Sequence, residues 1–171
     1  EKAIKLEKDA LAQIENITAD NARLVSNLHA NLGGLYRMNG HPDLAREHME
    51  KSISLLDQFN LLHINDSIPQ IANYAMFLTE QQEPERGISE LQKLSGIIKE
   101  YHSDDCLDYA KVQETLGTIY LMTANLPQAK THFKRAFKIY EKIWADEPEM
   151  IEAKYQEIQE LYPQIGFCIG K

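Results

Sequence analysis

The stretch Leu32-Gly33-x-x-Tyr36 recurs as Leu116-Gly117-x-x-Tyr120, 84 residues further along the chain. Each copy is followed at the same distance by a small residue and then a large apolar one, as Ala45-x-x-x-Met49 and Ala129-x-x-x-Phe133. These apolar residues recur three and four positions apart, which places them on one face of a helix. The small residues allow two helices to approach closely. The two stretches therefore predict helix pairs that repeat along the chain.

Half of this spacing, 42 residues, predicts an intermediate copy that begins near position 74. Tyr74-Ala75-x-x-Leu78 and Gly87-x-x-x-Leu91 lie there in a weaker form. The same period extends outward. Alanines stand 42 residues before Ala45 and Ser52, and apolar residues stand 42 residues after Leu116 and Tyr120. These outer positions are Ala3, Ala10, Ile158 and Tyr162. Five registers that agree on one number indicate a repeat architecture.

The periodicity predicts an all-α chain without a competing β pattern. We expect first helices at 19–39, 67–82, 105–123 and 148–163, and second helices at 1–15, 43–60, 84–101 and 127–144. Together they form one array over 1–171, with complete repeats at 19–60, 67–101 and 105–144. Prolines at the helix starts agree with these boundaries, because proline in a first turn loses no hydrogen bond.

The repeat resembles the tetratricopeptide repeat (TPR), whose signature contains L-G-x2-Y followed by A-x3-F. The usual period is about 34 residues. The longer period of 42, together with the segments 136–142 and 146–148, is similar to the kinesin light chain type. The resemblance implies a right-handed superhelical solenoid of antiparallel helix pairs. It also implies a non-catalytic scaffold that binds a peptide segment or partner helix in its concave groove.

Half-repeats at 1–15 and 148–163 leave apolar helix faces at both ends of the array. We therefore expect the chain to be a fragment of a longer protein, in which further elements cover these faces. The alternative is that the tail 164–171 is the native end. Exposed ends also predict possible self-association of the chain.

Composition excludes several classes of protein. The 171 residues contain 43% hydrophobic and 26% charged residues and carry a formal net charge of −8. A chain this acidic argues against nucleic-acid binding by this region, since phosphate contacts need a basic face. No apolar run is long enough to span a membrane. The absence of a signal segment and the two unpaired cysteines predict a cytoplasmic location.

Candidate chemical groups give no catalytic, metal or cofactor site. The six histidines lie in different segments without metal-ligand spacing, and we expect them to be structural, with His48 and His132 at solvated helix positions. Gly166 to Lys171 lacks the length and the hydroxyl of a phosphate loop, and Cys168 has no identifiable activating partner. The cations of 127–144 predict a solvated face, consisting of Lys130, Lys134, Arg135, Lys138 and Lys142.

The resemblance implies that the first helix of each repeat lines the groove. The groove residues that this implies are Asn31, Arg37, Asn73, Met76, Lys111, Thr118 and Leu121. Asn31 and Asn73 share one slot, where a side-chain amide either pairs with an extended peptide backbone or is only a polar surface group. The carboxylate clamp of chaperone-binding TPR domains is mostly missing, because only Asn73 and Lys111 match it, while Ala30, Gly34 and Thr115 replace its other members.

Two functions fit this pattern. The first is the non-catalytic protein-interaction scaffold. The alternative is a ligand- or peptide-sensing regulatory module of a larger transcription regulator or signalling protein. An attached DNA-binding or catalytic domain would favour the second. The identity of the partner is not encoded in a recognisable motif.

Overall fold

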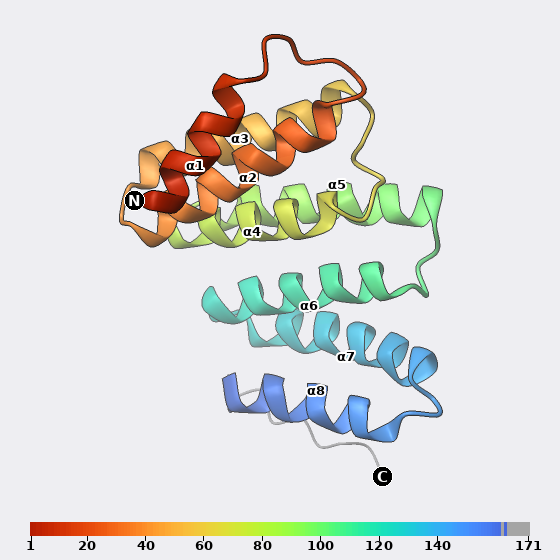
Figure 1. The fold of residues 1–171 in the computed structure, drawn as a ribbon. Helices are drawn as coiled ribbons and strands as arrows, with labels where there is room; N and C mark the ends of the chain where they lie inside the picture. Colours follow the sequence, from red (N-terminus) through yellow and green to blue (C-terminus); the bar gives the residue numbers. More distant parts are fainter. Residues whose placement is uncertain (162, 164–171) are drawn as a thin grey trace. The chain divides into compact units, whose positions relative to one another are not determined.

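The computed structural model describes residues 1–161 and 163, and every regular element in them is helical. The helices follow one another along the chain (Figure 1). They are α1 Lys2–Ala12, α2 Ala22–Met38, α3 Pro42–Gln58, α4 Ser67–Glu80, α5 Pro84–Tyr101, α6 Leu107–Met122, α7 Leu126–Ile143 and α8 Pro148–Leu161. Each lies within three residues of a predicted range. The predicted all-α class is correct. Gly166 to Lys171, with Cys168, and Tyr162 lie outside the described residues.

The chain divides into two compact units, residues 1–97 and residues 98–171. In the first unit, α2 packs against α1, α3 and α4. In its core, Tyr36 of the repeated motif packs with apolar side chains of α2, α3 and α4. The cluster consists of Leu32, Tyr36, Ala45, Met49, Tyr74, Phe77 and Leu78. In the second unit, α7 packs against both α6 and α8. Whether the predicted repeats form one array remains a prediction.

The glycine of the repeated motif marks the point where paired helices are closest. A Cβ atom at Gly33 would lie 2.6 Å from Cγ of Met49 and 3.3 Å from the carbonyl oxygen of Ala45. At Gly117 it would lie 2.8 Å from the ring of Phe133. Both alanines of the motif, Ala45 and Ala129, are fully buried. The small residues therefore hold α2 against α3 and α6 against α7, as the spacing predicts.

The first helices α2, α4 and α6 end in the same backbone turn. Gly40, Gln82 and Ala124, each 42 residues from the next, have positive φ angles of 73°, 65° and 58°. In each turn the next residue donates its N–H to a carbonyl five positions back, from His41 to Tyr36, from Glu83 to Leu78 and from Asn125 to Tyr120. This is the Schellman motif, which usually has glycine at the left-handed position. Gln82 and Ala124 adopt it at a cost of about 1 kcal/mol each.

The expectation that His48 and His132 are solvated is wrong. The ring of His48 stacks on Tyr36, with centroids 5.4 Å apart, and the ring of His132 stacks on Tyr120 at 5.2 Å. Both histidines are half-buried because one ring face is covered by the tyrosine of the repeated motif. His48 Nδ1 also lies 2.8 Å from His29 Nδ1. These histidines are packing residues between first and second helices.

Acid should destabilise the fold through these histidines. Burial lowers the pKa of His29 to about 4 and also lowers the pKa of His48 and His132. Above about pH 6.5 the histidines are neutral in both states, whereas below it the unfolded chain binds protons that the folded chain does not. The free energy of unfolding is therefore expected to fall as the pH drops from about 6.5 to about 4. Urea unfolding at several pH values measures this slope.

The variant His29→Phe keeps an aromatic ring in the same slot and removes one titrating group. We expect its unfolding free energy to depend less steeply on pH in this window than that of the wild type. Asn65→Ala, which replaces an exposed side chain and removes no titrating group, is the control and should leave the slope unchanged. Equal slopes for His29→Phe and the wild type would contradict the assignment.

Candidate functional site

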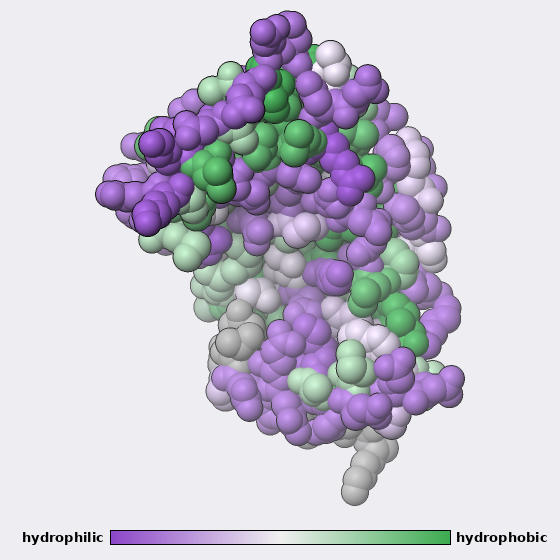
Figure 2. Space-filling model, in the orientation of Figure 1, coloured by the Kyte–Doolittle hydropathy of each residue, from purple (hydrophilic) through white to green (hydrophobic). Residues whose placement is uncertain are grey.

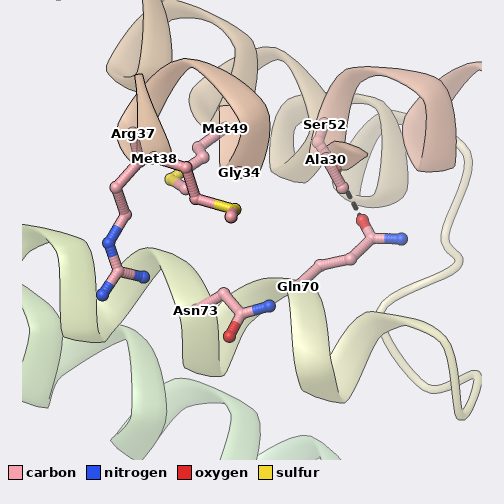
Figure 3. A pocket seen from close by; sticks show the side chains of 8 residues that line it. All are labelled: Ala30, Gly34, Arg37, Met38, Met49, Ser52, Gln70 and Asn73. Atoms are coloured by element: carbon pink, nitrogen blue, oxygen red, sulfur yellow. Dashed lines mark hydrogen bonds between the residues drawn. The ribbon is translucent and has the colours of Figure 1, made fainter. Parts of the chain in front are cut away.

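A pocket lies between α2, α3 and α4 in the first unit (Figure 3). We call it the methionine pocket, and its volume is ≈ 160 Å³. Two methionines and two small residues form its apolar part, and polar side chains stand at its edge. Its lining consists of Ala30, Gly34, Arg37, Met38, Met49, Ser52, Gln70 and Asn73. Figure 3 shows Asn73 on α4 facing the two methionines across the pocket.

A second, more open hollow continues from this pocket along α2 and α4. We call it the amide hollow, and its volume is ≈ 350 Å³. It shares Ala30, Gln70 and Asn73 with the methionine pocket. Its full lining consists of Asn27, Ala30, Asn31, Asp66, Pro69, Gln70 and Asn73. Four side-chain amides there supply both donors and acceptors.

Helical spacing explains why these residues meet. Positions 27, 30, 31, 34 and 37 lie three and four residues apart and form one stripe along α2. Positions 66, 69, 70 and 73 form the facing stripe at and after the start of α4. The small side chains of Ala30 and Gly34 leave room between the stripes. Both hollows therefore follow directly from the sequence of the first helices.

A buried polar network fixes one wall of the site. The hydroxyls of Ser26 and Ser52 are 3.1 Å apart, and both donate to Oε1 of Gln70. The amide of Gln70 donates in turn to Oδ1 of Asn27. Both serines are at most 1% exposed. Because buried polar groups need partners, this network orients Gln70 and Asn27 toward the hollows.

Sequence reasoning missed Met38, Met49, Ser52 and Gln70 as site residues, because it considered only selected slots of the first helices. A signal was available in the register comparison. Ser26, Ser52 and Gln70 are polar, whereas five of the six positions 42 and 84 residues later hold apolar residues, namely Ile68, Ala110, Leu94, Ala136 and Val112, and the sixth holds Lys154. Polar residues on three neighbouring helices, at slots that are mostly apolar elsewhere in the chain, indicate that they bond to one another.

The charged residues that line the two hollows, Arg37 and Asp66, are paired. The guanidinium of Arg37 contacts the Glu80 carboxylate through two of its nitrogens. At the far end of the amide hollow, Arg23 Nε lies 2.6 Å from Asp66 Oδ2. The hydrogen bond from Arg23 holds the pKa of Asp66 below its usual value. The two hollows therefore present little uncompensated charge.

The structure brings three of the predicted groove residues, Asn31, Arg37 and Asn73, to the two hollows. The amide of Asn31 donates to Oε1 of Glu7 on α1 at 3.0 Å. Among the residues that the structure describes, none hydrogen-bonds the Asn73 side chain. Met76, one turn further along α4, is half-buried and lies outside both linings. Asn31 and Asn73 thus share a register but not an environment.

The other predicted groove residues lie on α6 in the second unit. Lys111 is exposed, with its Nζ 3.9 Å from Oδ1 of Asp108. The hydroxyl of Thr118 donates to the carbonyl of Glu114, one helical turn earlier. Leu121 is only 8% exposed. Lys111 is therefore the most exposed of the three, and the role of all three in binding stays a prediction.

The described residues contain no group of three or more histidine, cysteine or acidic side chains placed to hold a metal ion. In that same part of the chain, no helix combines the length and apolarity that a membrane span requires.

The predicted basic face of α7 is exposed. Arg135 lies 3.9 Å from Asp104, and Lys142 donates to Asp105.

Comparison with known proteins identifies the repeat. The tetratricopeptide repeat model matches residues 67–142, from α4 to α7. A comparison with the curated proteins gave no match. The fold is similar to that of BtubC (BKLC) from P. vanneervenii, with 21% identity and a TM-score of 0.71 over 82% of this chain and 56% of that one.

The fold is also similar to the nearly identical TPR-like repeats of a Podosopora anserina protein named as a candidate kinesin light chain. That match has 14% identity and a TM-score of 0.72, over 84% of this chain and 68% of the other. These two structural matches, at 21% and 14% identity, show the fold alone. The chain spans little more than half the length of BtubC. The two matches confirm the predicted class, an all-α solenoid fold of TPR helix pairs. Residues 67–142 match the tetratricopeptide repeat model, and the helix pairs of this chain are similar to those of tetratricopeptide repeat proteins.

Proposed function

We propose that this chain is a non-catalytic protein-interaction scaffold that binds an extended peptide segment of a partner along the α2–α4 face. TPR repeats generally mediate protein–protein interactions. The bound segment would cross the amide hollow and the methionine pocket in the first unit. In the second unit, Lys111, Thr118 and Leu121 on α6 would contact peptide in their own right.

The observation that carries this proposal is the amide of Asn73, which lines both hollows and which none of the described residues hydrogen-bonds. A side-chain amide can donate to a peptide carbonyl and accept from a peptide N–H. It can therefore hold an extended backbone without reading its sequence. Asn31 would join it once a ligand competes with Glu7 for the amide.

A cytoplasmic location belongs to this proposal, since the free thiol of Cys106 is compatible with a reducing compartment. Self-association also remains a prediction. The exposed apolar side chains of the first unit include Leu6 at 71% and Leu24 at 55%. Figure 2 shows apolar surface beside α1 within a mostly hydrophilic face. Sedimentation over a range of concentrations would show any association as a rising mass.

Asn73→Ala tests the proposal. Short random peptides displayed on phage are selected against the wild-type chain, and the selected peptides are synthesised. We expect Asn73→Ala to weaken their binding by about 5- to 10-fold, because each lost hydrogen bond contributes about 1 kcal/mol. Fluorescence anisotropy measures the affinity, and circular dichroism should show unchanged helicity and melting temperature, since Asn73 is exposed.

Asn65→Ala is the matched control, because Asn65 is also exposed but lies outside both linings. It should bind the selected peptides as tightly as the wild type does. Equal affinities of all three proteins would reject backbone recognition by Asn73. Failure to select any peptide would reject the peptide-binding scaffold itself.

A further inference from the structure

Gly34 lies inside α2 without a packing reason to be glycine. A Cβ atom built there has no atom within 4 Å, whereas one at the adjacent Gly33 would contact Met49 and Ala45. The backbone of Gly34 is ordinary helix, so no left-handed conformation requires glycine either. Glycine in a helix interior is destabilising relative to alanine. The helix therefore carries a cost at Gly34 that no contact with the described residues offsets.

The slot of Gly34 holds a side chain in the other repeats. The residues 42 and 84 positions later are Met76 and Thr118. The helix geometry thus accepts a side chain at this position, and only the first repeat leaves it empty. The space that results is part of the methionine pocket.

The pocket walls suit an uncharged apolar group. Ala30, Met38 and Met49 supply aliphatic and thioether surface, and Met38 is 84% exposed at the edge. Thioether side chains adapt their shape to apolar partners. Arg37, the one charged lining residue, is already paired with Glu80. A charged ligand group would have to break this pair to gain a partner.

The size of the pocket matches one large side chain. An engineered apolar cavity of about 150 Å³ binds benzene, and the methionine pocket has ≈ 160 Å³. Asn73 lies at the same pocket, where its amide can hold the backbone of the residue whose side chain enters.

We propose that the methionine pocket receives one large apolar side chain of the bound peptide, of the leucine, methionine or phenylalanine class, and that Gly34 determines this specificity by leaving the space for it. This inference rests on the proposed function and adds the chemical class of the residue that is recognised. Because the neighbouring charges are paired, binding at this pocket depends little on ionic strength.

Capped single amino acids test the pocket without knowledge of the natural partner. The probes are the N-acetyl, N-methylamide derivatives of leucine, methionine, phenylalanine, alanine, aspartate and lysine. The chain is labelled with ¹³C at its methionine methyl groups, so that Met38 and Met49 report on the pocket and Met76, Met122 and Met150 serve as internal references. We expect saturable shifts of the first two signals with the three large apolar probes only.

Gly34→Met places in the first repeat the residue that the next repeat has in this slot. It should raise the melting temperature and weaken the binding of the leucine probe about tenfold or more, since the pocket is then filled from within. Gly34→Ala should give a smaller loss. Gly96→Met is the matched control, because Gly96 is also helical with no atom within 4 Å of a Cβ, and it lies outside the pocket. This control should keep full binding.

Two results would overturn the inference: undiminished binding of the leucine probe by Gly34→Met, or equal shifts with the aspartate, lysine and leucine probes. The selected peptides separate this failure from failure of the proposed function. Peptides that lose affinity with Asn73→Ala but not with Gly34→Met, and share no apolar position, would retain the scaffold and reject the pocket. Saturation by the leucine probe without any selected peptide would support the pocket and reject peptide binding.

Discussion

Phe133→Ala is expected to lower the free energy of unfolding of the second unit by about 3–5 kcal/mol. Phe133 is fully buried, and its ring lies where a Cβ atom at Gly117 would be 2.8 Å away. Removing the ring deletes its buried apolar surface and leaves a cavity between α6 and α7. Urea unfolding followed by circular dichroism measures the loss.

Thr131→Ala is the control for Phe133→Ala. Thr131 is exposed on the same helix, and its hydroxyl donates to the carbonyl of Pro127 one turn earlier in the helix. Its replacement should change stability by no more than about 0.5 kcal/mol. A loss for Phe133→Ala as small as this would show that the α6–α7 interface is not the core of the second unit.

Gly87→Ala is expected to cost about 1–3 kcal/mol through overpacking. A Cβ atom at Gly87 would lie 2.6 Å from the carbonyl oxygen of Ala75 and 3.2 Å from its carbonyl carbon. Backbone atoms cannot rotate away as a side chain can, so α5 must move from α4. Thermal unfolding of the purified variant should show a lower midpoint.

Gly96→Ala in the same helix should do the opposite. No atom lies within 4 Å of a Cβ there, so alanine only improves helix propensity, by about 0.5–1 kcal/mol. The pair separates the effect of close packing from that of glycine in a helix. If both substitutions stabilised α5, the contact between Gly87 and Ala75 would not be tight in solution.

The helices could be predicted because one period governs the whole chain. The weak copy at 74–91 contains few motif residues, yet α4 and α5 lie within two residues of the ranges that the period assigns. Ends of helices were less predictable at α1 and α2, where the prediction began or ended three residues from the observed bounds. Neither α1 nor α2 has a proline in its first turn. Such a proline marks the start of α3 and of α7.

The site was predictable only in part. Slot counting led to Asn31, Arg37 and Asn73, which the structure places at the two hollows. Slot counting could not show that the amide of Asn31 donates to Glu7, because this hydrogen bond joins residues from separate helices. It also assigned His48 and His132 to solvent, because a polar residue on a second helix gives no sign of the tyrosine stacked on it.

The shared turn after α2, α4 and α6 bears on how such repeats are detected. Its geometry is the same at Gly40, Gln82 and Ala124, although only one of the three is glycine. The turn therefore forms whether the residue there is glycine, glutamine or alanine. A profile that rewards glycine at this column would undervalue two of the three turns in this chain. Counting the distance between them would recover all three, because the turns stand 42 residues apart whichever residue occupies them.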